Sequence, residues 1–110
     1  VSALTRATMH TMLRDPQTHE ILHRLIAEGI DVAKAAGVDP QTDAAERLRW
    51  ADHLADVKTS MLQDLEARKP LELEPILGAV VELALRYDVR VPMLATTYAL
   101  TKALERAVLQ

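Results

Sequence analysis

Two groups of side chains in this sequence have the types and spacing to support chemistry. His19, Glu20 and His23 match H-E-x-x-H, in which two histidines one helical turn apart bind zinc and the glutamate acts as general base on a zinc-bound water. Ser60 and Glu72 place a hydroxyl and a carboxylate on either side of a proline-marked break. Whether either group forms a functional site depends on the helices and turns that carry its residues.

The zinc interpretation lacks a third ligand. The extended motif requires a glycine and then a third histidine at the positions that Ile26 and Gly29 occupy. Glu46 or His53 could supply a ligand from another helix, but no supporting pattern surrounds either residue. The simpler alternative is that both histidines flank the apolar stripe of an amphipathic helix, which continues through Ile26 and Ile30. We therefore expect no metal site and regard a zinc hydrolase as an unlikely alternative.

Other catalytic patterns are weaker. Ser60, His53 and Asp56 could be imagined as a Ser-His-Asp triad, but nothing like a nucleophile elbow surrounds the serine, and a helix cap is the simpler role for it. The three glycines are scattered, so the chain contains neither a G-x-G-x-x-G fingerprint nor a P-loop.

Composition narrows the function classes. The 110 residues carry 13 basic and 16 acidic side chains and a formal charge of −3, which is no electrostatic footprint for nucleic acid or an anionic membrane. No apolar run approaches the ~20 residues of a membrane span. The chain has no cysteine, which fits a reducing interior. We expect a cytoplasmic protein that contacts neither nucleic acid nor membrane.

Apolar spacing and punctuation predict an all-α bundle of about five helices within one domain, residues 1–110. The core must be aliphatic because the chain contains no Phe, one Trp and two Tyr, and no period-two pattern persists long enough to indicate a strand. The predicted helices run from Pro16 to a stop at Gly37, through Ala45–Val57, from Thr59 or Ser60 past Leu65, from Pro75 through Leu85, and from Pro92 through Val108.

The break around Pro70 gives Ser60 and Glu72 a possible joint role. A serine at a helix start offers its hydroxyl beside exposed backbone N–H groups, which suits a carboxylate or oxyanion. A glutamate just before another helix start lies near a partial positive charge. The break at Pro70 can bring the Ser60 hydroxyl and the Glu72 carboxylate to the same edge of the domain. The alternatives are a plain cap for Ser60 and a plain acidic first-turn residue for Glu72 or Glu74.

The segment around this break resembles the C-terminal domain of ketopantoate reductases, the NADPH-dependent 2-dehydropantoate 2-reductases. That family shows S-M-x-Q-D, then R-x-T-E-I, then a pair such as N-G before an apolar helix. The resemblance covers most of the chain. The matching strings here are Ser60-Met61-Leu62-Gln63-Asp64-Leu65, Arg68-Lys69-Pro70-Leu71-Glu72-Leu73 and Gly78-Ala79-Val80-Val81, with further similarity at Leu4-Thr5, Leu13-Arg14-Asp15-Pro16 and Tyr87-Asp88-Val89 with Pro92.

The resemblance implies a helical domain related to the 6-phosphogluconate dehydrogenase C-terminal fold, which closes a cleft against an N-terminal Rossmann domain that binds NADPH. Ser60 then matches the family's substrate-binding serine. Glu72 matches the glutamate near the substrate and the nicotinamide, so it is the catalytic candidate and a possible cofactor contact. Gln63 and Asp64 are expected to be structural.

The chain also departs from the family pattern. The family's general-acid lysine lies upstream of the matched segment, so the chain does not contain it, and Lys58 and Lys69 are not candidates for that role. Ser2 stands where the family has an asparagine, which weakens any transfer of substrate contacts there. Leu71 replaces a threonine. Asp88 replaces a turn glycine, a change that Asp can accommodate in a left-handed conformation.

The expected parent protein reduces ketopantoate to pantoate in pantothenate and coenzyme A biosynthesis. The expected partners are a small 2-ketoacid, the Rossmann domain and a second copy in a homodimer. Because the chain opens on Val1-Ser2-Ala3 and lacks the dinucleotide loop and the proton donor, we expect a designed or proteolysed piece that is inactive alone. The alternatives are a paralogous 2-ketoacid reductase and a free-standing helical interaction module.

Overall fold

The computed structural model describes residues 1–54, 56, 58–71 and 73–109, and every regular element in those ranges is a helix. The predicted all-α class is therefore confirmed. The elements are α1 (Ser2–Thr5), α2 (Met9–Arg14), α3 (Pro16–Ala35), α4 (Ala44–Asp52), α5 (Ser60–Glu66), the π-helical turn η1 (Glu74–Gly78), α6 (Ala79–Arg86) and α7 (Pro92–Leu109).

Two short helices, α1 and α2, precede the five that periodicity predicts. Each is too short to show an apolar repeat of its own, and each depends on packing against the rest of the molecule. The fourth predicted helix starts as the π-helical turn η1 before continuing as α6. Within the described ranges, no helix combines the length and hydropathy that a membrane span requires.

The ends of α3 follow their local sequence signals. The Asp15 carboxylate accepts a hydrogen bond from the Gln17 N–H at 2.8 Å, with Pro16 at the first helical position. At the other end Gly37 adopts φ 88°, and the Val38 N–H returns to the Ala33 carbonyl at 2.9 Å. These contacts satisfy backbone groups that a helix end leaves free.

The predicted extent of the next helix is wrong at its C-terminal end. α4 stops at Asp52 rather than continuing through Leu54, and Val57 lies outside the described residues. The Leu54 N–H bonds the Ala51 carbonyl at 3.1 Å, in a tight final turn. Beyond it, contacts to the N-terminal segment hold the chain away from a helical path.

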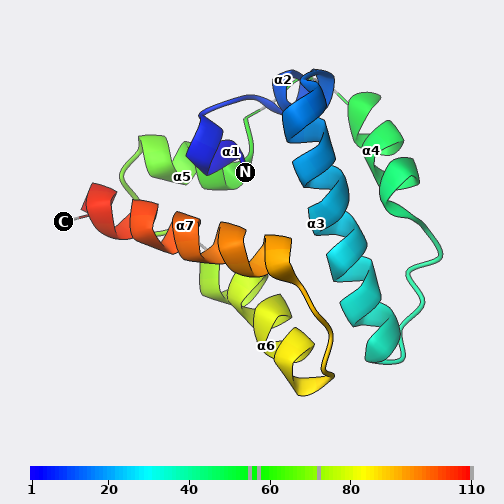
Figure 1. Cartoon of the computed structure of the whole chain (residues 1–110). Coiled ribbons are helices and arrows are strands. Elements are labelled where there is room, and N and C mark those ends of the chain that lie inside the picture. Colours follow the sequence, from blue (N-terminus) through cyan, green and yellow to red (C-terminus); the bar gives the residue numbers. More distant parts are fainter. Residues whose placement is uncertain (55, 57, 72, 110) are drawn as a thin grey trace.

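The start of α7 meets α3, and the rest of α7 runs away from the α3–α4 pair (Figure 1). α3 and α4 lie side by side with α2 across one end, and α6, which contacts α3 and η1, lies below α7 in this view. α1 and α5 lie together near the C-terminal half of α7. One buried cluster consists of Ala3, Leu65, Leu71 and Leu73, and a second consists of Val32, Ala84, Val91 and Leu94. Leu77 packs against both clusters and joins them.

Two glutamates tie distant segments to α7. The Glu28 carboxylate, on α3, accepts the Met93 N–H at 3.0 Å and the Leu94 N–H at 2.7 Å in the first turn of α7. Near the other end of α7, Glu105 accepts the Leu71 N–H at 2.7 Å. Both contacts satisfy backbone donors that would otherwise lack a partner, and together they fix α7 against α3 and against the segment that follows α5.

Candidate functional site

Ser60 is the first residue of α5, but it is not the cap. The cap is Thr59, whose hydroxyl accepts the Leu62 N–H at 3.3 Å. Ser60 is exposed, and its hydroxyl makes no hydrogen bond to any residue in the described ranges. Thr59, and not Ser60, is therefore the helix cap. Ser60 is exposed at the start of the helix.

A second hydroxyl, that of Ser2, helps to fix the start of α5. The Ser2 and Thr59 hydroxyls are hydrogen-bonded to each other, and Ser2 is only 6% exposed. Ser2 therefore joins α1 to the start of α5 and does not face an open surface. Ser2 stands where the resemblance expected an asparagine contact to substrate, and its hydroxyl is already engaged within the protein.

The loop before α5 is anchored to the start of α2. The Asp56 carboxylate accepts the His10 N–H at 3.0 Å and the Thr8 hydroxyl at 3.1 Å. The His10 ring Nε2 lies 2.6 Å from the Leu54 carbonyl oxygen. We call these contacts of Thr8, His10, Leu54 and Asp56 the α2 clamp. They connect positions at least 44 residues apart, so no local sequence signal could have indicated them.

The charge of Asp56 suits its place in the α2 clamp. The His10 backbone N–H, followed by the Thr8 hydroxyl and the nearby charges of His10 and Arg14, lowers the pKa of this exposed carboxyl. An ionised carboxylate makes stronger hydrogen bonds than a neutral acceptor. The α2 clamp thus remains intact at neutral pH and fixes the chain that leads into Thr59 and Ser60.

Glu72, the predicted catalytic residue, lies outside the described residues, so its position relative to Ser60 stays a prediction. Glu74 is described and has a structural partner. Its carboxylate accepts the Tyr98 hydroxyl at 2.5 Å and lies 3.6 Å from the Lys102 ammonium. Glu74 therefore connects η1 to α7.

The residues of the H-E-x-x-H string have other neighbours. Glu20 pairs with Arg24 at 2.8 Å, and this hydrogen bond lowers the pKa of the glutamate. Among the described residues, no group of three or more potential ligands is close enough to hold a metal ion. His19 and His23 each line a hollow that residues of α4 also line.

The imagined Ser-His-Asp arrangement does not form either. The Asp56 carboxylate binds Thr8 and His10, and His53 is the C-cap of α4. No described hydrogen bond joins Ser60, His53 and Asp56. Gln63, expected to be structural, donates from its side chain to the Lys58 carbonyl at 3.1 Å and so supports the turn before α5.

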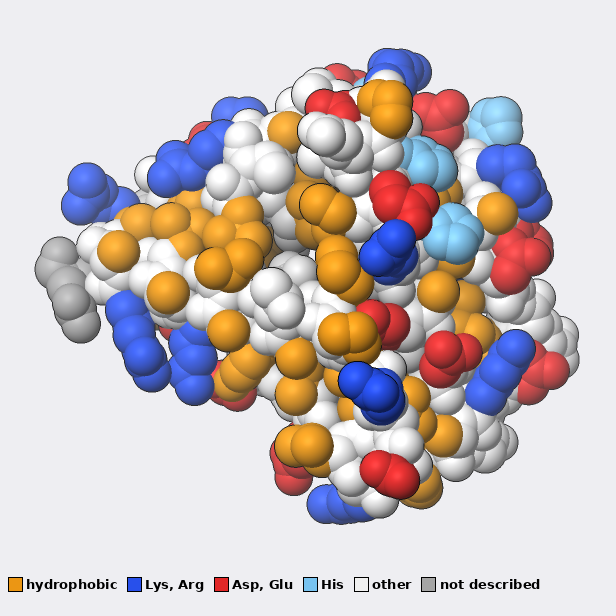
Figure 2. Space-filling model, viewed as in Figure 1, with side chains coloured by type: hydrophobic (Ala, Val, Ile, Leu, Met, Phe, Trp, Pro, Cys, Tyr) orange, Lys and Arg blue, Asp and Glu red, His pale blue; other side chains and the backbone are white. Residues whose placement is uncertain are grey.

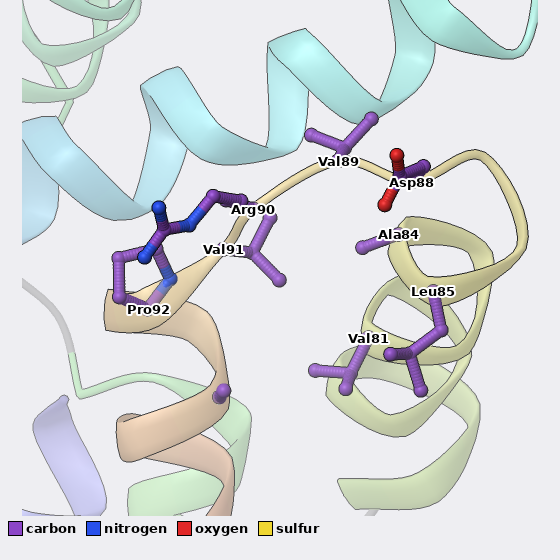
Figure 3. Close-up of a pocket in the computed structure, with 9 residues that line it drawn as sticks. Val81, Ala84, Leu85, Asp88, Val89, Arg90, Val91 and Pro92 are labelled. Atoms are coloured by element: carbon purple, nitrogen blue, oxygen red, sulfur yellow. The ribbon is translucent and has the colours of Figure 1, made fainter.

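A separate hollow of about 540 Å³ lies between the C-terminal end of α6 and the start of α7. We call it the α6–α7 groove. Figure 3 shows the Val81 and Val91 side chains pointing into the gap between the two elements, with Leu85 on the face of α6 beside it. Among the described residues that line it, Asp88 and Arg90 are the charged ones. Ser60 does not line it, so the groove and the candidate substrate edge are different surfaces.

The all-helical fold, with Ser60 exposed at the start of α5, agrees with one class of protein, the helical domain of a reductase. The family model for the C-terminal region of ketopantoate reductase (Ketopantoate reductase PanE/ApbA C terminal) matches residues 1–105. The chain belongs to this family.

Curated relatives of this chain are named 2-dehydropantoate 2-reductases. The 2-dehydropantoate 2-reductase of Halobacterium salinarum is 34% identical over 106 residues, covering 96% of this chain and 35% of the relative. That of Mesorhizobium japonicum is 31% identical over 104 residues, covering 94% and 32%. The chain thus spans about a third of the length of these relatives.

Solved structures show the same fold. The 2-dehydropantoate 2-reductase of Methylococcus capsulatus matches 99% of this chain with TM-score 0.90 and 31% identity, over 35% of its own length. A dimeric ketopantoate reductase from Staphylococcus aureus matches 97% with TM-score 0.87 and 26% identity, over 38% of its own length. A D-mandelate dehydrogenase, at 18% identity and TM-score 0.85, shares the fold alone.

Proposed function

We propose that the protein containing this chain is an NADPH-dependent 2-dehydropantoate 2-reductase and that this chain forms the substrate-side wall of its cleft. Family membership and the names of the curated relatives support the proposal. In the reaction, hydride passes from NADPH to the 2-keto carbon and a general acid protonates the carbonyl oxygen, which gives the 2-hydroxy acid and NADP⁺.

The chain's own residues fit the substrate side better than the cofactor side. Its three glycines, Gly29, Gly37 and Gly78, do not form a dinucleotide-binding loop. NADPH is therefore assigned to an N-terminal Rossmann domain upstream of this chain, together with the general-acid lysine. Such a protein would belong in the cytoplasm, in keeping with a chain that has no cysteine.

The Ser60 hydroxyl is the single feature that carries the proposed role. It is exposed and has no partner among the described residues, and the Thr59 cap, the Ser2–Thr59 bond and the α2 clamp fix the backbone that carries it. Because this backbone is already ordered, binding a substrate carboxylate has to order only the serine side chain. We assign Ser60 to orienting the 2-ketoacid, and Glu72 to the region near its keto group and the nicotinamide.

Ser60 is tested in the full-length protein by following NADPH oxidation with ketopantoate. Ser60→Ala removes one hydrogen bond to a charged substrate group, so kcat/KM should fall about tenfold or more, mainly through KM. Thr96→Ala, at an exposed hydroxyl on α7, is the matched control and should leave both constants unchanged.

Glu72 is tested with the same assay. Glu72→Ala should lower kcat, because its assigned place is beside the reacting atoms. Unchanged kinetics in Ser60→Ala would remove that residue from the site, and full activity in Glu72→Ala would do the same for Glu72. A wild-type protein inactive on every 2-ketoacid tested would overturn the reductase assignment itself.

A reductase acting on another 2-ketoacid is the second candidate. The observation that favours it is the Ser2–Thr59 bond, which engages a hydroxyl at a position where the family resemblance expects a substrate contact. A site with one polar contact fewer should discriminate less strongly for the hydroxyl of ketopantoate. Comparing kcat/KM for ketopantoate with kcat/KM for its analogue without that hydroxyl separates the two candidates.

We also propose that the parent protein is a homodimer, because a structurally similar family member is described as dimeric. Sedimentation or light scattering on the full-length protein measures this directly. A single monomeric species at micromolar concentration would contradict it.

A further inference from the structure

The α2 clamp is built from contacts that add little to global stability and act on one short segment. All of its hydrogen bonds are exposed to solvent, and bonds that compete with water contribute modestly to folding. Asp56 nevertheless uses both carboxylate oxygens in it: Oδ1 accepts the His10 N–H and Oδ2 accepts the Thr8 hydroxyl. A contact at two points fixes the direction of the chain as well as its position.

Asp56 takes the place of a local cap on α2. Within the described ranges, the side chain of Thr8, the N-cap residue, accepts no backbone N–H of that helix, and the free His10 N–H is satisfied by Asp56 instead. Figure 2 shows histidine, acidic and basic side chains mixed over the end of the molecule where α2 and α4 lie. The nearest basic side chain, Arg14, pairs with Asp52 at 3.7 Å. The Asp56 carboxylate is therefore committed to α2 rather than to a surface cation.

The path from Asp56 to the start of α5 is short. Thr59 follows Asp56 by three positions, a stretch of chain that spans at most about 11 Å. Thr59 is held on its other side by its bonds to Leu62 and Ser2. In Figure 1 α2 lies between α4 and the pair formed by α1 and α5. Three residues are too few to absorb a large displacement, so a shift of Asp56 is passed on to Ser60.

We propose that Asp56 is a positioning residue for Ser60. Both of its oxygens are engaged by Thr8 and His10, so it acts through the serine and not on the substrate. It keeps the start of α5 in the orientation from which the Ser60 hydroxyl donates to the 2-ketoacid. This inference rests on the proposed role of Ser60, and it adds to the site a residue that lies outside the S-M-x-Q-D string.

The alternative is a purely structural role, in which Asp56 only holds the loop that follows α4. The two roles differ in their effect on substrate binding. A structural residue changes the stability of the protein and leaves KM as it is. A positioning residue raises KM with little change in kcat, because the hydride and proton transfers use other groups.

The test follows NADPH oxidation with ketopantoate in the full-length protein. Asp56→Ala should raise KM about five- to tenfold and leave kcat within about twofold. The upper limit is the effect of Ser60→Ala, since a residue that acts through the hydroxyl cannot cost more than its removal. Asp56→Asn keeps an acceptor for the His10 N–H and should raise KM no more than about threefold. Asp43→Ala is the matched control, because this exposed aspartate caps α4 by accepting the Glu46 N–H at 2.7 Å, and its KM should equal that of the wild type.

A double-mutant cycle tests whether Asp56 acts through Ser60. Once the hydroxyl has been removed, its position no longer matters. Asp56→Ala combined with Ser60→Ala should therefore give a KM within about twofold of Ser60→Ala alone. Two effects that multiply would show that Asp56 influences binding by another route and would overturn the proposal.

Amide exchange measures the anchoring of α5 without any substrate. The Leu62 and Gln63 N–H groups bond the hydroxyl and the carbonyl of Thr59, so their protection reports on the order of this helix start. Asp56→Ala should lower both protection factors about tenfold, and Asp43→Ala should leave them unchanged.

Four results would each overturn the proposal: unchanged KM or unchanged protection in Asp56→Ala, an equal rise of KM in Asp43→Ala, and an Asp56→Asn variant as impaired as Asp56→Ala. If Asp56→Ala does not fold, Thr8→Val takes its place, because it removes one of the two donors, and a rise of KM of about twofold is expected. A wild type inactive on every 2-ketoacid would overturn the proposed function, and the exchange measurement would still decide whether Asp56 fixes the start of α5.

Discussion

Removing the Glu28 carboxylate should destabilise the fold more than removing any surface glutamate. Its two oxygens accept the Met93 and Leu94 N–H groups at the start of α7, an 18-residue helix. An anion there satisfies two donors that the helix leaves free and lies at the positive end of the helix dipole. Pro92 has no N–H, so these two contacts account for the next donors of the first turn.

The size of the effect follows from these contacts. Each hydrogen bond to a charged group contributes about 1.5 kcal/mol or more. Water can reach the freed N–H groups because the site is only partly buried, which recovers part of the loss. Glu28→Ala should therefore cost about 2 kcal/mol, a value at the upper end for loss of a helix cap. Glu28→Gln keeps one acceptor and should cost about 1 kcal/mol.

Urea unfolding followed by circular dichroism measures these changes, and thermal unfolding should show a decrease of about 10 °C for Glu28→Ala. Glu82→Ala is the matched control, because Glu82 is an exposed glutamate whose partner Arg86 is 3.8 Å away, and exposed pairs contribute less than about 1 kcal/mol. The reasoning fails if Glu28→Ala and Glu82→Ala unfold at the same urea concentration.

Two further predictions concern side chains that join distant elements. The His10 N–H lowers the pKa of Asp56 below its ordinary 3.8. The stabilisation is therefore complete above pH 4 and is lost as the pH falls through the folded-state pKa. The protection factor of the His10 amide, which is its exchange rate corrected for the intrinsic pH dependence, should be high from pH 5 to 7 and fall below that pKa, and a pH-independent protection factor would contradict this. Tyr98→Phe removes the bond to Glu74 and should cost about 1 kcal/mol in urea unfolding. Tyr87→Phe, at a tyrosine that is 44% exposed, should cost less, and equal losses would argue against the bond.

The parts of the fold that sequence could predict are those governed by neighbouring residues. Asp15 with Pro16 starts α3, Gly37 ends it, and Thr59 caps α5. Asp88 adopts the left-handed conformation that its place in the turn requires. In each case the signal and its structural effect lie within a few residues, so reading the chain locally is sufficient.

The parts that could not be predicted depend on contacts between distant residues. α4 ends at Asp52 because the following residues are bonded to the start of α2, whereas periodicity alone predicts a helix that continues past Leu54 to Val57. Glu28 looks like an ordinary polar position of α3, yet it caps α7, 65 and 66 residues away. No spacing rule reveals a partner at that separation.

The same distinction bears on how the candidate site is built. A short motif can place a serine at the start of α5, but the direction of that helix start is set by Ser2 and by the Asp56 carboxylate. A chain with the same S-M-x-Q-D string but without these contacts would have the hydroxyl without its fixed position. The substrate-binding geometry proposed for Ser60 is therefore a property of the contact between the first ten residues and the segment before α5, and variants at Ser2 or Asp56 should alter KM for the 2-ketoacid without touching it.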